Sequence, residues 1–387
     1  MHRVQWRETT GEDERMAYDF RRYTDYMAKN GIDVVIASNY DITARMLGDY
    51  FTDLKLITHG CKEYNRLVGC DSAGEMIVVN CPKVPNAKGA QIARPLFEPH
   101  VRELARILNE RGLGGGVIGL EMLDFPAKGL MMLQEALPQA TFVDATWVIR
   151  QDMAVKTPRE LHLIERAVDI CEAGFRKVMA HMRESIGRPV SELIFRHFAP
   201  EVNRLGGEVV GCNLISRPWE WHNEKNDFVP PEMYRKEPLV TEGGAPINFD
   251  LLCGYHGLMC DIAFRGMPGQ PDPEWAKLWD VSVIAKDALV DAVKAGMTCG
   301  EAQETCVAAM EKAVGNAYDG QYWAVHGVGL HVHEFPQVGS PYNGDSAEYV
   351  FEAGCVLSVE SIAEEAYLLT ENGMRRIGTM PMKIYQA

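Results

Sequence analysis

The first 150 residues alternate short apolar runs with segments of helical periodicity. Four of these runs are predicted as strands, namely residues 33–37, 75–79, 117–120 and 142–143. Between the second and third, residues 99–111 repeat apolar side chains at helical spacing. Strands that alternate with helices in this way predict a small α/β domain ending near residue 150.

A second unit begins at a strong helix start signal. Thr157, Pro158 and Glu160 supply an N-cap hydroxyl, a proline at the first helical position and the glutamate of a capping box. Apolar residues then recur at spacings of three and four over residues 161–175, which predicts a long helix with one buried face. A second long helix is predicted over residues 275–295.

Length and charge narrow the kind of protein and its partners. The 387 residues favour two domains, which we predict at residues 1–150 and 156–387. With 54 acidic and 39 basic residues the formal net charge is −15, so neither nucleic acid nor an anionic membrane is an expected partner. No apolar stretch is long enough to span a bilayer, and no secretory signal is visible. The ten cysteines form no CxxC pair, so we expect reduced thiols and a cytoplasmic location.

The segment 246–264 is predicted as a β-hairpin with two apolar arms. If Tyr255 and His256 form a two-residue loop, Asp250 lies directly opposite Asp261, with Cβ atoms roughly 5 Å apart. Two like charges facing each other in an apolar hairpin destabilise it unless a shared proton or, better, a divalent cation neutralises them. In the alternative the register slips and one aspartate faces water.

A second pair of acids is predicted on a second hairpin. An apolar strand ends at Glu360, and another begins at Glu364 and continues to Thr370. A three-residue loop over 361–363 would set the two glutamates opposite each other. Taken alone, such a pair would usually lie in solvent at the end of a hairpin. Because the first hairpin supplies two more acids, a cluster of four carboxylates is the better interpretation.

Three histidines, His326, His331 and His333, lie within eight residues. The glycines on both sides of Val328 leave the His326 side chain unhindered, and strand alternation would put His331 and His333 on one face. Imidazole suits Zn, Mn, Co or Fe, although a lone histidine is more often a core residue. Joined to the two hairpins, His326 gives a predicted centre of four carboxylates and one imidazole, which is enough for two metal ions.

The order of these motifs resembles the pita-bread metallohydrolases, which include methionine aminopeptidases, Xaa-Pro aminopeptidases, prolidases and creatinases. The resemblance covers about residues 156–380 and rests on the two aspartates, on HGVGLHVHEFP from His326 to Pro336, and on EEAYLLTENG. It implies an α+β protein, with a C-terminal pita-bread domain whose curved antiparallel sheet is covered by helices. A smaller α/β creatinase-type domain would precede it, and the resemblance also implies a homodimer.

The resemblance further implies a role for each site residue. Two divalent ions (Mn, Co, Zn or Fe) would be bound by Asp250, Asp261, His326, Glu360 and Glu364. Asp261 and Glu364 would bridge both ions, and Glu365 is the alternative to Glu364 because the excursion between the glutamates is shorter than usual in the family. Glu360 would also shuttle a proton. His333 and His222 would be catalytic through contacts with the substrate.

The sequence departs from the peptidase pattern at three places. Asp250 is followed by Leu251-Leu252 where peptidases have x-Gly, and Asp261 by Ile-Ala-Phe-Arg where they have x-Thr-Arg-Thr. Ile362 stands where proline-specific members commonly carry an arginine. These departures weaken the hypothesis that the substrate is a dipeptide more than they weaken the prediction of a metal centre.

Three functions remain open from the sequence. The first is hydrolysis of an amide-type C–N bond in a dipeptide or small metabolite, by metal-activated water and a glutamate proton shuttle. The second is a lyase on a small onium or sulfonium substrate, as in dimethylsulfoniopropionate lyases, which Trp219, Trp221 and Trp323 would favour. Those lyases carry an aspartate at the position of His333, so the histidine favours hydrolysis. The third is an inactive binding protein, and substrate contacts are expected from the loop 216–242.

Overall fold

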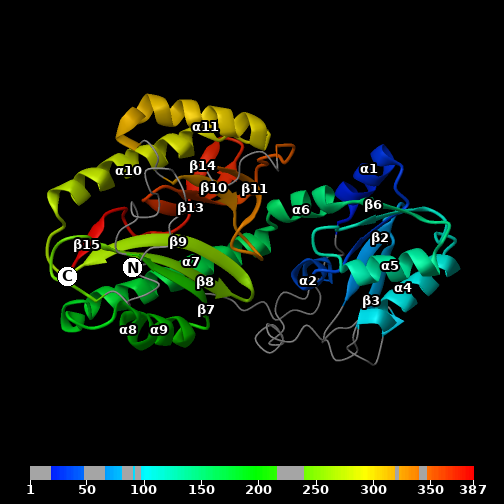
Figure 1. The fold of residues 1–387 in the computed structure, drawn as a ribbon, viewed down its shortest axis with the longest axis horizontal. Coiled ribbons are helices and arrows are strands. Elements are labelled where there is room, and N and C mark those ends of the chain that lie inside the picture. The colour runs from blue at the N-terminus through cyan, green and yellow to red at the C-terminus, as the bar shows by residue number, and fades with distance from the viewer. Residues whose placement is uncertain are drawn as a thin grey trace. The chain divides into compact units, whose positions relative to one another are not determined.

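The computed structural model describes residues 19–47, 66–80, 90–91, 97–215, 239–318, 322–339 and 347–387. The chain divides into two compact units, Met1–Ile149 and Arg150–Ala387. Each unit has its own β-structure, with one sheet in the first and two sheets in the second (Figure 1). Among the described residues, no helix combines the length and the apolar character needed to cross a membrane.

The first unit contains a six-stranded sheet with the order β4-β3-β2-β1-β5-β6. Its strands are β1 (Val34–Ala37), β2 (Leu67–Asp71), β3 (Met76–Asn80), β4 (Ala90–Gln91), β5 (Val117–Leu120) and β6 (Thr141–Asp144). The four predicted strands are therefore present, as β1, β3, β5 and β6, while β2 and β4 were not predicted. The sheet is mixed, because β1 pairs in parallel with β5 but antiparallel with β2.

Four helices belong to this unit among the described residues. They are α1 (Arg21–Asn30), α2 (Tyr40–Leu47), α4 (Phe97–Glu110) and α5 (Ala127–Ala136), and a further helix, α6 (Thr146–Ala154), spans the division between the two units. The predicted helix at 99–111 corresponds to α4, whose Leu104 and Leu108 pack with Ile36 and Ile118 of the sheet in one buried cluster. The helical period of α4 thus places its apolar face on the sheet.

The second unit is built on two sheets. A four-stranded sheet has the order β15-β9-β8-β7, and a five-stranded antiparallel sheet has the order β11-β10-β12-β13-β14. The strands of the first are β7 (Glu208–Ile215), β8 (Ile247–Tyr255), β9 (Leu258–Met267) and β15 (Ile384–Gln386). Those of the second are β10 (Ala324–Gly327), β11 (Glu334–Gly339), β12 (Val356–Glu360), β13 (Glu364–Thr370) and β14 (Gly373–Arg376). The two sheets meet where β9 contacts β13.

Helices cover these sheets on two sides (Figure 1). They are α7 (Pro158–Ala180), α8 (Val190–Leu193), a π-helical turn (Ile194–Phe198), α9 (Ala199–Arg204), α10 (Pro273–Ala292) and α11 (Cys299–Ala313), with 3₁₀ turns at Arg183–Ser185 and Gly315–Tyr318. Helix α7 packs on β8 and β9, whereas α10 contacts β12 and β14, and α11 contacts β11. The predicted helix at 275–295 is therefore α10.

Helix α7 begins at the predicted capping box. The Thr157 hydroxyl accepts a hydrogen bond from the Glu160 amide at 3.2 Å, and the Glu160 carboxylate accepts one from the Thr157 amide at 2.8 Å. Two orphan amides of the first turn are satisfied in this way. Further along, the Phe175 ring stacks on Phe264 of β9 with centroids 4.3 Å apart, which fixes the helix on the sheet.

The hairpin formed by β8 and β9 has a different register from the predicted one. Its two-residue turn is His256-Gly257, so Asp261 pairs with Leu252 and Asp250 pairs with Ala263. The predicted direct opposition of the two aspartates is wrong. Both turn residues have positive φ, 50° and 79°, which a hairpin of this twist requires and which glycine adopts far more readily than Tyr255 would. Because the register shift is two residues, both aspartates keep the same face and become diagonal neighbours.

The hairpin formed by β12 and β13 has the predicted register, with Glu360 opposite Glu364. Its three-residue loop, 361–363, is bonded to the helical layer. The Ala363 amide donates to the Ser282 hydroxyl of α10 at 2.6 Å, and the Ile362 amide donates to the Tyr318 hydroxyl at 3.0 Å. The loop is therefore buried, and the two glutamates are held at the edge of the core rather than in solvent.

Candidate metal centre

Two overlapping groups of ligand atoms lie where the sheets meet. In one, a carboxylate oxygen from each of Asp250, Asp261 and Glu364 lies within 4.8 Å of the others. In the other, ligand atoms of Asp261, His326, His333 and Glu360 meet the same distance limit. The two groups share Asp261, so together they form one continuous cluster of carboxylate and imidazole groups that could hold metal.

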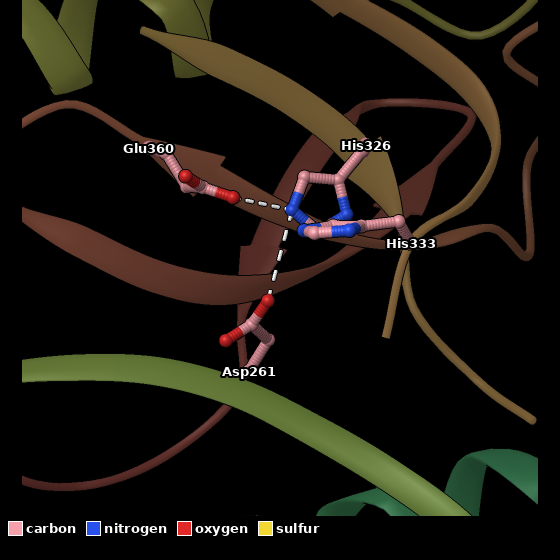
Figure 2. A group of neighbouring side chains, drawn as sticks. All are labelled: Asp261, His326, His333 and Glu360. Carbon is pink, nitrogen blue, oxygen red and sulfur yellow. Dashed lines mark hydrogen bonds and ion pairs between the residues drawn. The ribbon is translucent and has the colours of Figure 1, made fainter. Parts of the chain in front are cut away.

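The ring of His326 is fixed by its own backbone. Its Nδ1 lies 3.0 Å from the Gly327 carbonyl oxygen, which can only accept, so Nδ1 carries the proton. This leaves Nε2 facing the acids, next to an oxygen of Glu360 and 3.7 Å from Oδ2 of Asp261. Figure 2 shows both carboxylates approaching the same ring nitrogen. Such a backbone bond is how metal-binding histidines are usually oriented.

His333 and His331 separate in the structure, and the prediction that they share a strand face is wrong. The backbone bends between Gly329 and His333, and β11 begins only at Glu334. His333 is exposed, and its ring lies edge-on to His326 with centroids 4.5 Å apart (Figure 2). Glycine at 329 lets the bend pack against Lys156, because a Cβ there would lie 2.7 Å from the Lys156 side chain.

Burial and mutual repulsion strain the acids in this cluster. Burial, and then the charges of the neighbouring carboxylates, hold the pKa values of Asp261 and Glu364 well above the usual range. Burial also acts to raise the pKa of Glu360, but the adjacent His326 outweighs it and lowers that pKa. The pKa of His326 is raised because Glu360 more than offsets the effect of burial. Such a cluster needs protons or cations for balance, and carboxylates with imidazole suit divalent transition metals.

Glu365 is not part of either ligand group. It pairs with Val359 on the ladder, one residue along from Glu364, so it points to the opposite face. Its Oε2 accepts from the Lys286 ammonium at 2.6 Å, and Arg376 contacts its other oxygen. Of the two alternatives left by the sequence, the geometry favours Glu364 as the ligand.

A buried ion pair beneath the histidine segment was missed by the sequence reasoning. Lys156 donates to Glu334 at 2.7 Å, and the ammonium also donates to the Met153 carbonyl at 2.7 Å. The second Glu334 oxygen accepts from the His331 amide at 2.9 Å. These bonds pin the bend that carries His333. The signal was present, since Lys156 directly precedes the capping box at Thr157 and Glu334 lies within HGVGLHVHEFP.

One predicted site residue cannot be placed. His222 lies in the segment 216–238, outside the described residues, as do Trp219 and Trp221. Trp323 is described and lies next to β10.

Comparisons with known proteins bear on the fold. A dipeptidase structure from Pyrococcus horikoshii OT3 superposes with a TM-score of 0.71 at 19% identity, covering 95% of this chain and 99% of the other. At that identity the likeness shows the fold alone. It confirms the predicted α+β architecture, with an N-terminal domain ahead of a C-terminal pita-bread domain.

Sequence relatives bear on the family. The Xaa-Pro dipeptidase of Pyrococcus furiosus is 27% identical over 245 residues, which are 59% of this chain and 64% of that protein, less than two thirds of its length. The creatinase of a Bacillus species is 20% identical over 403 residues, 96% of this chain and 92% of the relative. The family model for metallopeptidase family M24 matches residues 162–380, which is more than half of the chain. As the resemblance predicted, this chain belongs to metallopeptidase family M24.

Proposed function

We propose that this protein is a metal-dependent hydrolase that cleaves an amide-type C–N bond in a dipeptide or small metabolite. The observation that carries the proposal is the pair of ligand groups that share Asp261. Family membership supports it, and so do two relatives whose names are Xaa-Pro dipeptidase and creatinase. Both names fit chemistry at a C–N bond of a small molecule.

Five side chains would hold two divalent ions. Asp250, Asp261 and Glu364 would form one site, and Asp261, His326 and Glu360 the other. When bound, such a pair of ions makes hydroxide available near neutral pH and polarises the carbonyl under attack.

Glu360 and His333 would then act on the substrate. The lowered pKa of Glu360 keeps its carboxylate ionised, so it can accept a proton and return it to the leaving nitrogen. Burial, together with the charge of His326, lowers the pKa of His333. A neutral, partly accessible imidazole can donate one N–H to the oxygen on which charge develops. His222 would be a further substrate contact, proposed from the resemblance alone.

The apolar side chain at Ile362 means that the substrate need not be an Xaa-Pro dipeptide. This side chain is 5% exposed, and its amide is already bonded to Tyr318. It offers no positive charge to a substrate carboxylate, in contrast to the arginine common at this position in proline-specific members. Small C–N metabolites are therefore as good candidates as Xaa-Pro dipeptides.

The test combines metal reloading with a substrate panel. Chelated protein would be reloaded separately with Mn, Co, Zn or Fe and assayed on Xaa-Pro dipeptides, other dipeptides, creatine-like compounds, and sulfonium and betaine compounds. We expect release of an amine from one class; release of an alkene would instead identify a lyase. A protein that neither retains nor rebinds a transition metal would refute the proposal.

A variant tests the proton shuttle. We expect Glu360→Gln to lower kcat by roughly 100-fold to 10,000-fold, because the amide cannot carry the proton. The control is Glu371→Gln, which removes an exposed carboxylate from the turn after β13. An unchanged rate in Glu360→Gln, with metal bound, would remove that role.

A further inference from the structure

Arg265 is a buried cation on the face of β9 that carries the acids. Strand alternation puts it on the same side as Asp261, and its cross-strand partner Asn248 is on the side of Asp250. Arg265 lines a small cavity together with Glu364, and the residue is only 3% exposed. Arg265 is therefore buried beside one of the proposed metal ligands.

This guanidinium has almost no hydrogen-bond partner among the described residues. Nη1 donates to the Phe264 carbonyl over 3.4 Å, at the limit of a bond, and the buried Nε has no acceptor. The guanidinium carbon lies 6.0 Å from the ring centre of Trp279. Leaving a buried charge so poorly bonded costs several kcal/mol unless other charges compensate.

Two acids of the cluster supply that compensation through space. Burial lowers the pKa of Arg265 to about 10, against the opposing attraction of Glu364 and then Asp250, so it remains a cation at neutral pH. The other two acids that line the cavity already have cationic partners. Glu365 is paired with Lys286 and Arg376, and Glu172 with Arg176. The positive charge of Arg265 is therefore directed at the proposed metal ligands.

The position of this arginine differs from the peptidase pattern by one residue. The pattern Asp-x-Thr-Arg-Thr has its arginine at the position of Phe264, where alternation would point the side chain away from Asp261. Here the strand carries Phe264 on that opposite face, stacked against Phe175, and Arg265 on the acid face. A one-residue change along the strand thus moves a charge to the metal side.

We propose that Arg265 is a fixed counter-charge of the metal centre, which weakens its hold on divalent cations by offsetting one of its four carboxylates. The inference rests on the proposed function, since it requires that the cluster bind metal. Removing the charge should leave the ligand set more negative and its affinity for cations higher. A residue with a purely structural role would have the opposite effect or none.

The experiment measures Mn²⁺ affinity rather than turnover. Chelated Arg265→Met, Arg265→Lys and parent proteins would be titrated with Mn²⁺ in competition with a chelating dye. We expect Arg265→Met to bind roughly tenfold more tightly or better, and Arg265→Lys, which keeps the charge, to stay within about twofold of the parent. The control is Arg204→Met, which removes an exposed charge paired with Glu201 on α9.

Each result decides the question. Unchanged or weaker Mn²⁺ binding by folded Arg265→Met would overturn the inference, as would a tenfold change in Arg265→Lys. If Arg265→Met does not fold, Arg265→Gln, which also removes the charge but keeps a hydrogen-bonding group, carries the test, with roughly tenfold tighter Mn²⁺ binding expected. A parent protein that binds no metal ion would instead refute the proposed function, which separates the two failures.

Discussion

The two hairpins that supply the carboxylates differ in what fixes their acids. In β12–β13, Glu360 and Glu364 flank the loop directly, so loop length alone sets them opposite each other. In β8–β9, Asp250 and Asp261 lie several residues from the turn and end up diagonal. The comparison shows that strand alternation determines which face of the sheet a side chain occupies, even far from the turn. Which residues lie opposite each other depends instead on the turn.

The turns themselves are held in different ways. The backbone amides of the loop 361–363 donate hydrogen bonds to the hydroxyls of Ser282 and Tyr318, which belong to the helical layer. The turn His256-Gly257 has a left-handed backbone at both residues, so its conformation is set by local preferences. Tertiary contacts thus hold the loop of one hairpin in place, while local backbone preferences shape the turn of the other.

The largest expected effect separates two adjacent glutamates of the second hairpin. Glu364→Gln should weaken Mn²⁺ binding roughly 100-fold or more, because it removes a carboxylate from the acid face. Glu365→Gln should leave that affinity nearly unchanged but destabilise the fold by about 3–5 kcal/mol, since Lys286 loses its buried partner. Metal titration and denaturant unfolding of both variants check this. Equal loss of Mn²⁺ affinity in the two would show that both faces of β13 serve the metal.

A second effect concerns the acids that the two hairpins bring together. In the chelated protein, the raised pKa values of Asp261 and Glu364 mean that the folded state holds more protons than the unfolded state above about pH 4. Stability should therefore fall as pH rises from about 5 to 8, and His326, with its raised pKa, acts in the same direction. The lowered pKa of His333 acts in the opposite direction, raising stability with pH, but only around the ordinary pKa of histidine, about 6.5.

Thermal unfolding of the chelated protein between pH 5 and pH 8 tests that dependence. We expect the Tm to fall by several degrees with rising pH, and saturating Mn²⁺ to remove the decline because it replaces the protons. Glu364→Gln should flatten the curve without metal. A Tm that rises steadily with pH would mean that the acids are not crowded as described.

Much of this arrangement could be predicted from local sequence. The capping box at Thr157 fixed the start of α7, and apolar periodicity located α4 and α10, because caps and periodicity act within one element. The approach of Glu364 to Asp261 followed from two hairpins with acids on their inner faces. What joined them is tertiary, since the two hairpins belong to different sheets.

The misses have physical reasons as well. The aspartate register was wrong because the turn was assigned to Tyr255-His256, although Gly257 was the residue suited to positive φ. The bend before β11 broke the alternation expected for His331 and His333, and its support by Lys156 comes from a distant part of the chain. Arg265 was noticed only as a departure from a pattern, because its burial beside Glu364 depends on packing.

The smallest effect tests whether turn and face are separable in the first hairpin. Gly257→Ala should lower the free energy of unfolding by about 1–2 kcal/mol, because alanine resists the φ of 79°. Gly257→Asn should cost less, since asparagine tolerates this conformation. In both variants Mn²⁺ affinity should stay within about twofold of the parent, because the ladder still presents Asp250 and Asp261 on one face. If affinity fell in step with stability, the turn would control the position of the acids, and the distinction between register and face would not hold for this hairpin.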